Sequence, residues 1–441
     1  MLYESWGFTQ SPFETTSLPP SELGDRLLVG RDNEVNSLIR RITSGNKIAT
    51  LEGLNGVGKT SVVNVATYRL FEEHLDTGEG GLYIPCRKMF QLNACQDLHF
   101  FIDQVLMEVA QTLVEQSNFL SERGRGAQTK QIDRWLNAPQ LKSPSFGVTI
   151  GLFGLQGGGQ TETNTSTGFE RSGLRKTIQN LLEEVFPSQD SGGVVCTIDN
   201  LELLQSSDVA RSFLEQLRDE LFNIRGLRWV LCGALGIIYG IVASPRLDGY
   251  LHRPILIGEL DPRYAKDILT SRIDAYKSEF DTQLYLPIVD DDFVALYATL
   301  KGNLRNVLSY SDDYCQWCAD RELPHTVEEK RQSFKQWLSE QCDYAYESVR
   351  QELRPKALEV FSRGVGLGGI FSPGDFEIFG FNSIAAFRPH IKDLEVVGVV
   401  VSTQDDGDKR KKSIQITSKG WLVAHHLALL ESSRRVPGTS N

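Results

Sequence analysis

The sequence predicts a three-layer α/β domain, then an all-helical subdomain, then a C-terminal unit of helices and one β-hairpin. Short apolar runs typical of buried parallel strands alternate with helical stretches over residues 31–260. Strand signals stop after Asp261-Pro262, and helical spacing of apolar residues continues to about residue 345. Residues 350–441 change again, with two strand-like runs around a polar turn. We therefore divide the chain at 31–260, 261–345 and 350–441, after an N-terminal arm at 1–30.

The composition limits the class of protein. The 441 residues have room for two or three domains, and no run of eighteen apolar residues is present. The N-terminal sequence lacks a basic segment followed by an apolar one, so we expect no signal peptide. Seven scattered cysteines are typical of reduced thiols. We expect a cytoplasmic protein without membrane contact. Its net charge of −11 argues against a nonspecific nucleic-acid coat but allows a local basic patch.

The arm at residues 1–30 is rich in Pro, Ser and Thr but carries three large aromatic residues, Trp6, Phe8 and Phe13. Such side chains favour burial. We therefore expect the arm to pack onto the α/β domain that follows.

The strongest signal is Gly53-Leu54-Asn55-Gly56-Val57-Gly58-Lys59-Thr60, which matches G-x-x-x-x-G-K-[ST]. A strand-like run precedes it at 47–51 and helical spacing follows at 61–70, the context of a phosphate-binding loop (P-loop). Glycines allow backbone N–H groups to converge on a polyphosphate. We expect Lys59 to reach the β- and γ-phosphates and Thr60 to hold Mg²⁺. The predicted nucleotide-binding residues of the loop are Gly53, Asn55, Gly56, Val57, Gly58, Lys59, Thr60 and Ser61.

Beyond the P-loop helix we predict a strand at 81–86, a helix at 97–116 and a helix at 169–186. Residues 119–170 are polar and glycine-rich, and we interpret them as an insertion with a β-hairpin or mobile loop near 146–155. A plain surface excursion and a subunit or DNA contact both remain open for it.

A second functional strand is predicted at 193–200, an apolar run that ends in Asp199. A carboxylate at the end of a buried parallel strand, downstream of a P-loop, is placed to coordinate Mg²⁺ together with Thr60. A helix at 210–222 and strands at 227–233 and 254–258 complete the domain.

The subdomain at 261–345 is predicted to hold helices at 263–276, 291–300, 304–318 and after Thr326. Cys315 and Cys318 form an isolated C-x-x-C pair. A zinc site needs about four ligands, and no second pair lies near in sequence, so ordinary core thiols are the favoured interpretation.

The C-terminal unit is predicted to be a winged helix-turn-helix. We expect a helix around 350–361, a short helix after Phe371, and a helix over 383–394 that begins or bends near 387–389. Strands at 396–402 and 412–417 and a final helix from Ser418 follow. Residues 382–441 hold nine Lys and Arg against six Asp and Glu. The candidate DNA contacts are Arg388, Lys392, Lys409, Arg410, Lys411 and Lys412. A protein-interaction or packing module is the alternative.

Taken together, these residues resemble the AAA+ ATPases of the Orc/Cdc6 type and their STAND-type relatives, with bacterial transposition ATPases as further cousins. Trp6-Gly7-Phe8 with Pro12-Phe13 resembles their aromatic N-terminal motif. Val29-Gly30-Arg31-Asp32-Asn33-Glu34 resembles the box that flanks the adenine, which implies a nucleotide contact for Arg31. Gly302-Asn303-Leu304-Arg305 resembles the sensor-2 segment of the lid, which implies that Arg305 touches the γ-phosphate. The C-terminal hairpin resembles the wing of MarR-type proteins.

Two departures from the family pattern, and the choice of an arginine finger, bear on catalysis. Asn200 occupies the position after the aspartate where the family places an acidic base, and Glu202 is the candidate substitute. Cys232-Gly233 lacks the usual polar sensor-1 residue. Arg246 is the candidate arginine finger toward a neighbouring subunit, with Arg253 as runner-up; both have a plain surface role as the alternative. These departures imply slow or partner-stimulated hydrolysis.

The leading hypothesis is a Mg²⁺- and ATP-binding switch or weak ATPase that assembles with itself or a partner protein and binds DNA. The catalytic candidates are Lys59, Asp199, Glu202, Arg246 and Arg305. The alternative is a STAND-type signalling or defence ATPase with an autoinhibitory winged helix. A small-molecule kinase is less consistent with the helical lid.

Overall fold

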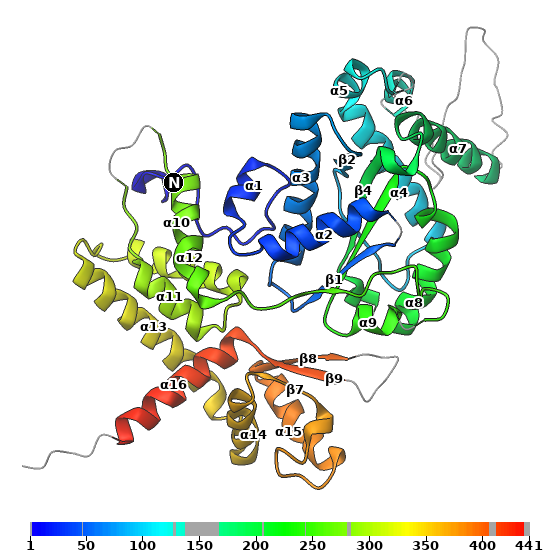
Figure 1. Cartoon of the computed structure of the whole chain (residues 1–441). Coiled ribbons are helices and arrows are strands. Elements are labelled where there is room, and N and C mark those ends of the chain that lie inside the picture. The colour runs from blue at the N-terminus through cyan, green and yellow to red at the C-terminus, as the bar shows by residue number, and fades with distance from the viewer. Residues whose placement is uncertain are drawn as a thin grey trace, which may run out of the picture.

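The structure is a computed structural model of the chain. It describes residues 2–45, 47–126, 129–136, 167–204, 207–242, 244–279, 284–404 and 412–435. Figure 1 shows an α/β domain, a helical lid beside it and a smaller C-terminal unit below the lid.

A six-stranded, parallel sheet forms the centre of the α/β domain. Its main path runs β2-β4-β5-β1-β6, and β3 pairs with the end of β4. The strands are β1 (Ala49–Gly53), β2 (Leu82–Pro85), β3 (Phe90–Gln91), β4 (Gly192–Asp199), β5 (Leu227–Gly233) and β6 (Ile255–Ile257). Because the strands are parallel, the loops after β1 and β4 open at the same edge of the sheet.

Helices cover both faces of the sheet, so the predicted three-layer α/β architecture is confirmed. The helices α2 (Asp32–Ser44) and α3 (Lys59–Thr77) share one apolar core with β1 and β5. The opposite core is built from α4 (Leu98–Glu115), α7 (Thr167–Val185), α8 (Ser207–Leu217) and α9 (Ile237–Val242). Burial on both faces explains why the strands read as continuous apolar runs.

The structure corrects three details of the α/β domain. The first strand lies two residues later than predicted, so it leads directly into the glycine loop. The sequence reading missed β3, because two residues carry no periodicity. The described part of the 119–170 insertion is helical, with α5 (Ser117–Glu122) and α6 (Thr129–Leu136). The hairpin predicted near 146–155 lies outside the described residues.

The lid consists of η5 (Pro262–Tyr264), α10 (Ala265–Tyr276), α11 (Asp290–Thr299), α12 (Leu304–Ala319) and α13 (Val327–Arg350). Cys315 and Cys318 are buried in it as unbridged cysteines. Burial raises the pKa of both thiols, so they are neutral core side chains at neutral pH.

The N-terminal arm, with η1 (Glu4–Trp6), packs mainly against this lid. Phe8 and Phe13 are each 1 % exposed and belong to the lid core. The Thr9 N–H donates to the Tyr276 carbonyl at 2.7 Å, and the Tyr3 hydroxyl donates to Asp312 at 2.5 Å. The aromatic residues of the arm therefore belong to the lid core and not, as we expected, to the core of the α/β domain.

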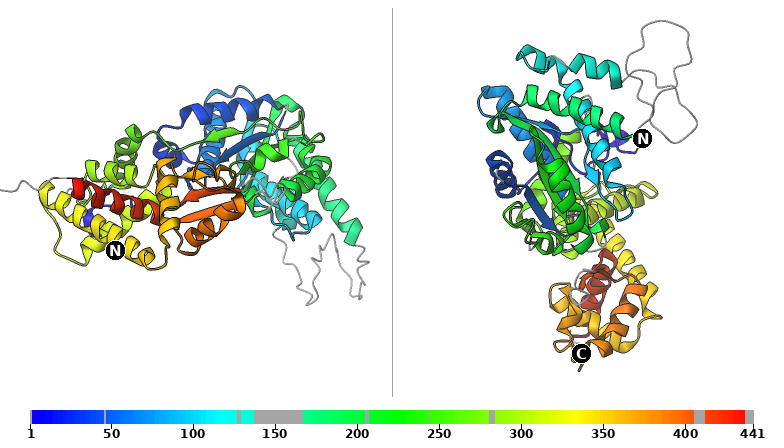
Figure 2. Two further views of the ribbon diagram at one scale, coloured as in Figure 1. Left: turned by 90° about the horizontal axis from the view of Figure 1, so that it is seen from below. Right: turned by 90° about the vertical axis from the view of Figure 1, so that its right-hand side faces the viewer.

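The described residues of the C-terminal unit form three α-helices, one short 3-10 helix and a small antiparallel sheet of strand order β7-β9-β8. Its elements are α14 (Pro355–Gly366), β7 (Ile370–Phe371), η6 (Pro373–Asp375), α15 (Ile384–Val396), β8 (Val400–Gln404), β9 (Lys412–Ile416) and α16 (Ser418–Arg435). In Figure 2 this unit, coloured orange and red, lies next to the lid. His426 of α16 pairs with Asp343 of α13 at 2.9 Å and stacks on Tyr346, so α16 joins the unit to the lid.

The structure corrects the start of one helix and the start of one strand in the C-terminal unit. The helix predicted over 383–394 is present as α15. It starts at Ile384 and not near 387–389, because Ser383 caps it through a bond from the Ala386 N–H at 3.3 Å. The strand predicted from residue 396 starts at Val400, since α15 continues to Val396. Gly398 then turns the chain at a φ of +75°.

Within the described residues, no helix is long and apolar enough to cross a membrane.

Candidate functional site

The glycine loop wraps around the start of α3. Gly56 and Gly58 have φ values of +83° and +95°, a region that favours glycine. Lys59 is the first residue of α3 and is buried; its ammonium group donates to the carbonyls of Gly53 at 2.9 Å and Leu54 at 3.1 Å. The loop therefore places a positive charge and a helix N-terminus at one point, which is an arrangement that binds anions.

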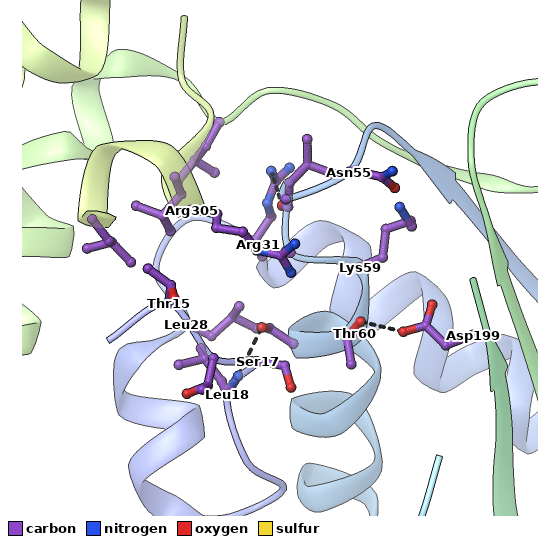
Figure 3. Close-up of a pocket in the computed structure, with 18 of the residues that line it drawn as sticks. Thr15, Ser17, Leu18, Leu28, Arg31, Asn55, Lys59, Thr60, Asp199 and Arg305 are labelled. Carbon is purple, nitrogen blue, oxygen red and sulfur yellow. Dashed lines mark hydrogen bonds between the residues drawn. The ribbon is translucent and has the colours of Figure 1, made fainter. Parts of the chain in front are cut away.

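Thr60 and Asp199 meet across the sheet edge. The Thr60 hydroxyl donates to the Asp199 Oδ2 at 2.6 Å, although 139 residues separate them. Asp199 is buried, and its Oδ1 accepts the N–H of Asn200 at 2.8 Å. A hydroxyl and a carboxylate oxygen in contact are the ligand types that Mg²⁺ prefers. Figure 3 shows this pair beside Lys59.

Arg31 lines the pocket, but its guanidinium is hydrogen-bonded to other parts of the protein. Its guanidinium donates to the carbonyl of Val57 at 3.3 Å and to that of Gly258 at 2.6 Å, and it pairs with Glu34 at 2.9 Å. These bonds tie the P-loop to the end of β6. A nucleotide would meet a guanidinium that already has three partners.

The lid reaches the P-loop through the start of α12. Asn303 caps this helix and also donates to the Asn55 carbonyl at 3.1 Å. A Cβ placed on Gly56 would lie 2.9 Å from the Asn303 side chain, so the contact is close. Arg305, two residues on, is exposed and lines the same pocket. Figure 3 shows Arg305 on the side of the pocket opposite Asp199.

The arm supplies a wall of the pocket, which the sequence did not predict. The Leu18 N–H donates to the Ser61 hydroxyl at 3.1 Å, and Asn64 donates to the Leu18 carbonyl at 2.6 Å. On the lid side, Arg272 donates to the carbonyls of Pro12 at 2.9 Å and Glu14 at 3.1 Å. Burial lowers the pKa of Arg272 to about 10. The segment between these anchors thus bridges the lid and the P-loop helix.

Together these parts enclose a pocket of about 620 Å³, here called the P-loop pocket. It is lined by the arm, the P-loop, the carboxyl ends of the strands and the lid. Its principal lining residues are Thr15, Thr16, Ser17, Leu18, Leu28, Arg31, Asn55, Gly56, Val57, Gly58, Lys59, Thr60, Ser61, Asp199, Asn200, Glu202, Leu260, Ile268, Arg272, Arg305 and Leu308.

The position after Asp199 and the candidate base Glu202 both lie in the segment that follows β4. Asn200 has a φ of +57°, a conformation that asparagine tolerates better than most residues. Glu202 lines the pocket, but its Oε2 accepts the Ala234 N–H at 3.0 Å. Burial, reinforced by the charge of Asp199, raises the pKa of the neighbouring Cys232 thiol. The side chain of Cys232 is therefore uncharged at neutral pH.

The arginine-finger candidates lie apart from the lining of the P-loop pocket. The Arg246 side chain is 63 % exposed and pairs with Glu215 at 3.4 Å. Arg253 is also exposed, and its carbonyl accepts a bond from Arg41 at 2.5 Å. Lys59 and Asp199 line the P-loop pocket of this chain, but Arg246 and Arg253 do not.

The DNA-contact candidates are described only in part. Arg388 and Lys392 are exposed and lie one turn apart on α15, so they share a face. Lys412 belongs to β9. Lys409, Arg410 and Lys411 lie outside the described residues.

No family model matches the sequence, and no curated protein matches it. The structure is similar to the Aeropyrum pernix ORC2 protein in its ADPNP-ADP complexes, with 11 % identity, 97 % of this chain and 100 % of that chain covered, and a TM-score of 0.46.

Two further solved structures are similar. The Walker-type ATPase PABY2304 of Pyrococcus abyssi has 12 % identity, covers 93 % of this chain and 99 % of its own, and gives a TM-score of 0.45. The Aeropyrum pernix ORC1 protein in complex with DNA has 16 % identity. The match covers 91 % of this chain and 94 % of that chain, with a TM-score of 0.40. Because the identities and TM-scores are this low, the assignment of the site rests on its own geometry.

Proposed function

We propose that this protein is a Mg²⁺- and ATP-binding switch of the AAA+ type, with weak or partner-stimulated ATPase activity. The observation that carries the proposal is the contact of Thr60 with Asp199 at 2.6 Å, next to the buried Lys59. A hydroxyl, a carboxylate and an ammonium group converge at a helix N-terminus. That combination suits a polyphosphate with its divalent cation.

The pocket offers a place for each part of ATP. Lys59 and the loop N–H groups would bind the phosphates, while Thr60 and Asp199 would hold Mg²⁺. The ion supplies neutralisation of the phosphate charge. The apolar side chains of Leu28, Leu260, Ile268 and Leu308 line the pocket as well and would cover the base. A volume of about 620 Å³ lies within the usual range for small-molecule sites.

Slow turnover follows from the residues around Asp199. Asn200 carries no proton-accepting carboxylate, and Glu202 already accepts a backbone N–H. Efficient hydrolysis would need Glu202 to leave Ala234 or a neighbouring subunit to supply Arg246. An arginine finger contributes about 10³–10⁵ in rate, so assembly would then control turnover.

Arg305 is expected to distinguish ATP from ADP. The change Arg305→Ala should weaken ATP binding about tenfold and leave ADP binding nearly unchanged, because its exposed guanidinium would reach only the γ-phosphate. Calorimetric titration with ADP and a non-hydrolysable ATP analogue measures both affinities. Lys266→Ala removes an exposed lid cation that is not part of the pocket lining and is the control. Equal losses for the two nucleotides would contradict this role.

We also propose that the C-terminal unit is a winged helix that binds DNA through α15 and the β8–β9 hairpin. Arg388 and Lys392 present two positive charges on one exposed face. Changing both to Ser should lower the steepness of the plot of log K for DNA binding against log salt concentration by about 1.8. Each phosphate contact contributes about 0.9 to this slope. Serines at Lys409, Arg410, Lys411 and Lys412 test the wing in the same way. Lys266→Ser with Lys277→Ser is the control, and an unchanged slope removes both elements from the interface.

One observation favours the STAND-type alternative. The C-terminal unit closes a cavity of about 270 Å³ against Asn55 and Gly56 of the P-loop, lined also by Thr417 and Ser418. Lys301 of the lid lies 5.3 Å from the Trp421 ring in a cation–π contact. In that role the unit would respond to the nucleotide and bind no DNA. A gel shift with and without ATP distinguishes the two functions.

A further inference from the structure

A second pocket lies at the edge of the sheet opposite the P-loop. Parallel strands begin at one edge and end at the other, and this pocket is formed where β1 and β5 begin. It has a volume of about 430 Å³ and is here called the pole pocket. Its lining residues are Ile42, Gly45, Lys47, Ile48, Gln189, Phe222, Asn223, Ile224, Arg225, Leu227, Arg228, Trp229 and Tyr250.

The lining carries positive charge without a matching carboxylate. Lys47, Arg225 and Arg228 line the pole pocket, and no acidic residue is among its described lining residues. The nearest acid along the chain is Asp190, which is exposed and follows Gln189. In a protein of net charge −11, this concentration of cations makes a local positive field that attracts anions.

Arg41 and His252, which neighbour the lining residues Ile42 and Tyr250 in sequence, are also influenced by nearby positive charges. Burial, with the charge of Arg40 added, lowers the pKa of Arg41. Burial, followed by the charges of Arg41 and Lys47, lowers the pKa of His252.

Two buried donors at the pole pocket lack acceptors. In the described part of the chain, the Arg228 Nε and the Trp229 Nε1 are buried without a hydrogen-bond partner. Arg228 and Trp229 are successive residues of β5, so their side chains project from opposite faces of the sheet. Because both line the pole pocket, the pocket extends around the beginning of β5. Trp229 is 4 % exposed, and its ring packs on Phe222 at 5.0 Å between centroids. A buried donor without an acceptor costs about 1–3 kcal/mol, which an acceptor on a ligand would recover.

We propose that the pole pocket binds a phosphate-bearing nucleotide, either free or as part of a nucleic-acid strand. Lys47, Arg225 and Arg228 would contact the phosphate. The half-buried Tyr250 offers aromatic surface on which a base stacks, a sequence-tolerant contact worth about 1–3 kcal/mol. The volume of the pocket also exceeds what a bare inorganic anion needs. This site is separate from the P-loop pocket and from the C-terminal unit.

The test compares charge variants in a Lys59→Ala background, which disables the P-loop pocket. The pole variant is Lys47→Gln with Arg225→Gln, because both side chains are exposed and their loss leaves the fold intact. The control is Arg263→Gln with Lys266→Gln, which removes the same charge from the lid, where both side chains are also exposed. Arg228→Lys, measured separately, keeps the charge but alters the donor geometry.

Two probes distinguish the source of the phosphate: AMP by calorimetry, and a fluorescent single strand of about 12 nucleotides by anisotropy. We expect the control to bind as the Lys59→Ala parent does, and the pole variant to lose about tenfold in affinity. For the strand, its salt slope should fall by about 1.4, from two lost phosphate contacts. Binding of AMP supports a free nucleotide, and binding of the strand alone supports a nucleic acid.

Equal binding by the pole variant and the control, or no binding of either probe to the parent, overturns the proposal. If the P-loop pocket does not bind nucleotide, Lys59→Ala leaves nucleotide binding unchanged. The comparison of the pole variant with the control then still tests whether the pole pocket binds the probes.

Discussion

Replacing Lys59 by alanine should weaken ATP and ADP binding by about a hundredfold or more. The Lys59 ammonium is buried at the start of α3 and is held at the loop by the carbonyls of Gly53 and Leu54. Charge-assisted hydrogen bonds contribute about 1.5–3 kcal/mol each, and contacts with two phosphates would therefore amount to about 3 kcal/mol or more. Calorimetric titration of the wild-type and variant proteins measures the difference.

The control for this experiment is Lys176→Ala, an exposed lysine on α7 that does not line the P-loop pocket. It should bind nucleotide as the wild type does. A thermal melt of each variant establishes that the fold is intact. Unchanged affinity in the folded Lys59→Ala protein would contradict the assignment of the P-loop pocket, and with it any ATP-dependent assembly.

Replacing Phe13 by alanine should lower the free energy of unfolding by about 3–5 kcal/mol, the usual effect of emptying a buried aromatic site. Phe13 is 1 % exposed and packs edge-on against Tyr3 in the lid core. It also precedes Glu14, whose carbonyl binds Arg272 at 3.1 Å. We therefore expect a loosened pocket wall and weaker nucleotide binding as a second effect. Urea unfolding and nucleotide titration measure the two effects.

Phe100→Ala is the matched control, because the Phe100 side chain is 58 % exposed on α4. Its stability should stay within about 0.5 kcal/mol of the wild type. If Phe13→Ala is as stable as this control, the arm does not belong to the lid core. If it is less stable but binds nucleotide normally, the arm is not a wall of the pocket.

The sequence predicted the α/β architecture well because its signals are local. Each buried strand is an apolar run, and each long helix carries an apolar face, so periodicity alone locates them. The P-loop is equally local, since eight consecutive residues at 53–60 define it. Short elements such as β3 and β7, of two residues each, hold too little pattern to be found this way.

Contacts between distant segments could not be predicted from the sequence. The aromatic residues of the arm indicated burial, and we expected them to pack on the α/β domain, but the structure places them in the lid core. Arg272 gave no signal, because only the folded chain brings its guanidinium to the carbonyls of Pro12 and Glu14. The bond from the Ala234 N–H to Glu202 likewise depends on the adjacency of β4 and β5. The roles of Arg31, Arg246, Arg305 and the DNA-contact residues remain predictions.

The central claim is that one Mg²⁺-bound nucleoside triphosphate occupies the P-loop pocket. The most direct test is calorimetric titration of the wild-type protein with a non-hydrolysable ATP analogue, with Mg²⁺ and with a chelator in its place. We expect one analogue bound per chain and markedly tighter binding with Mg²⁺, since Thr60 and Asp199 present their oxygens together. Absence of binding, or an affinity that does not depend on Mg²⁺, would contradict the claim.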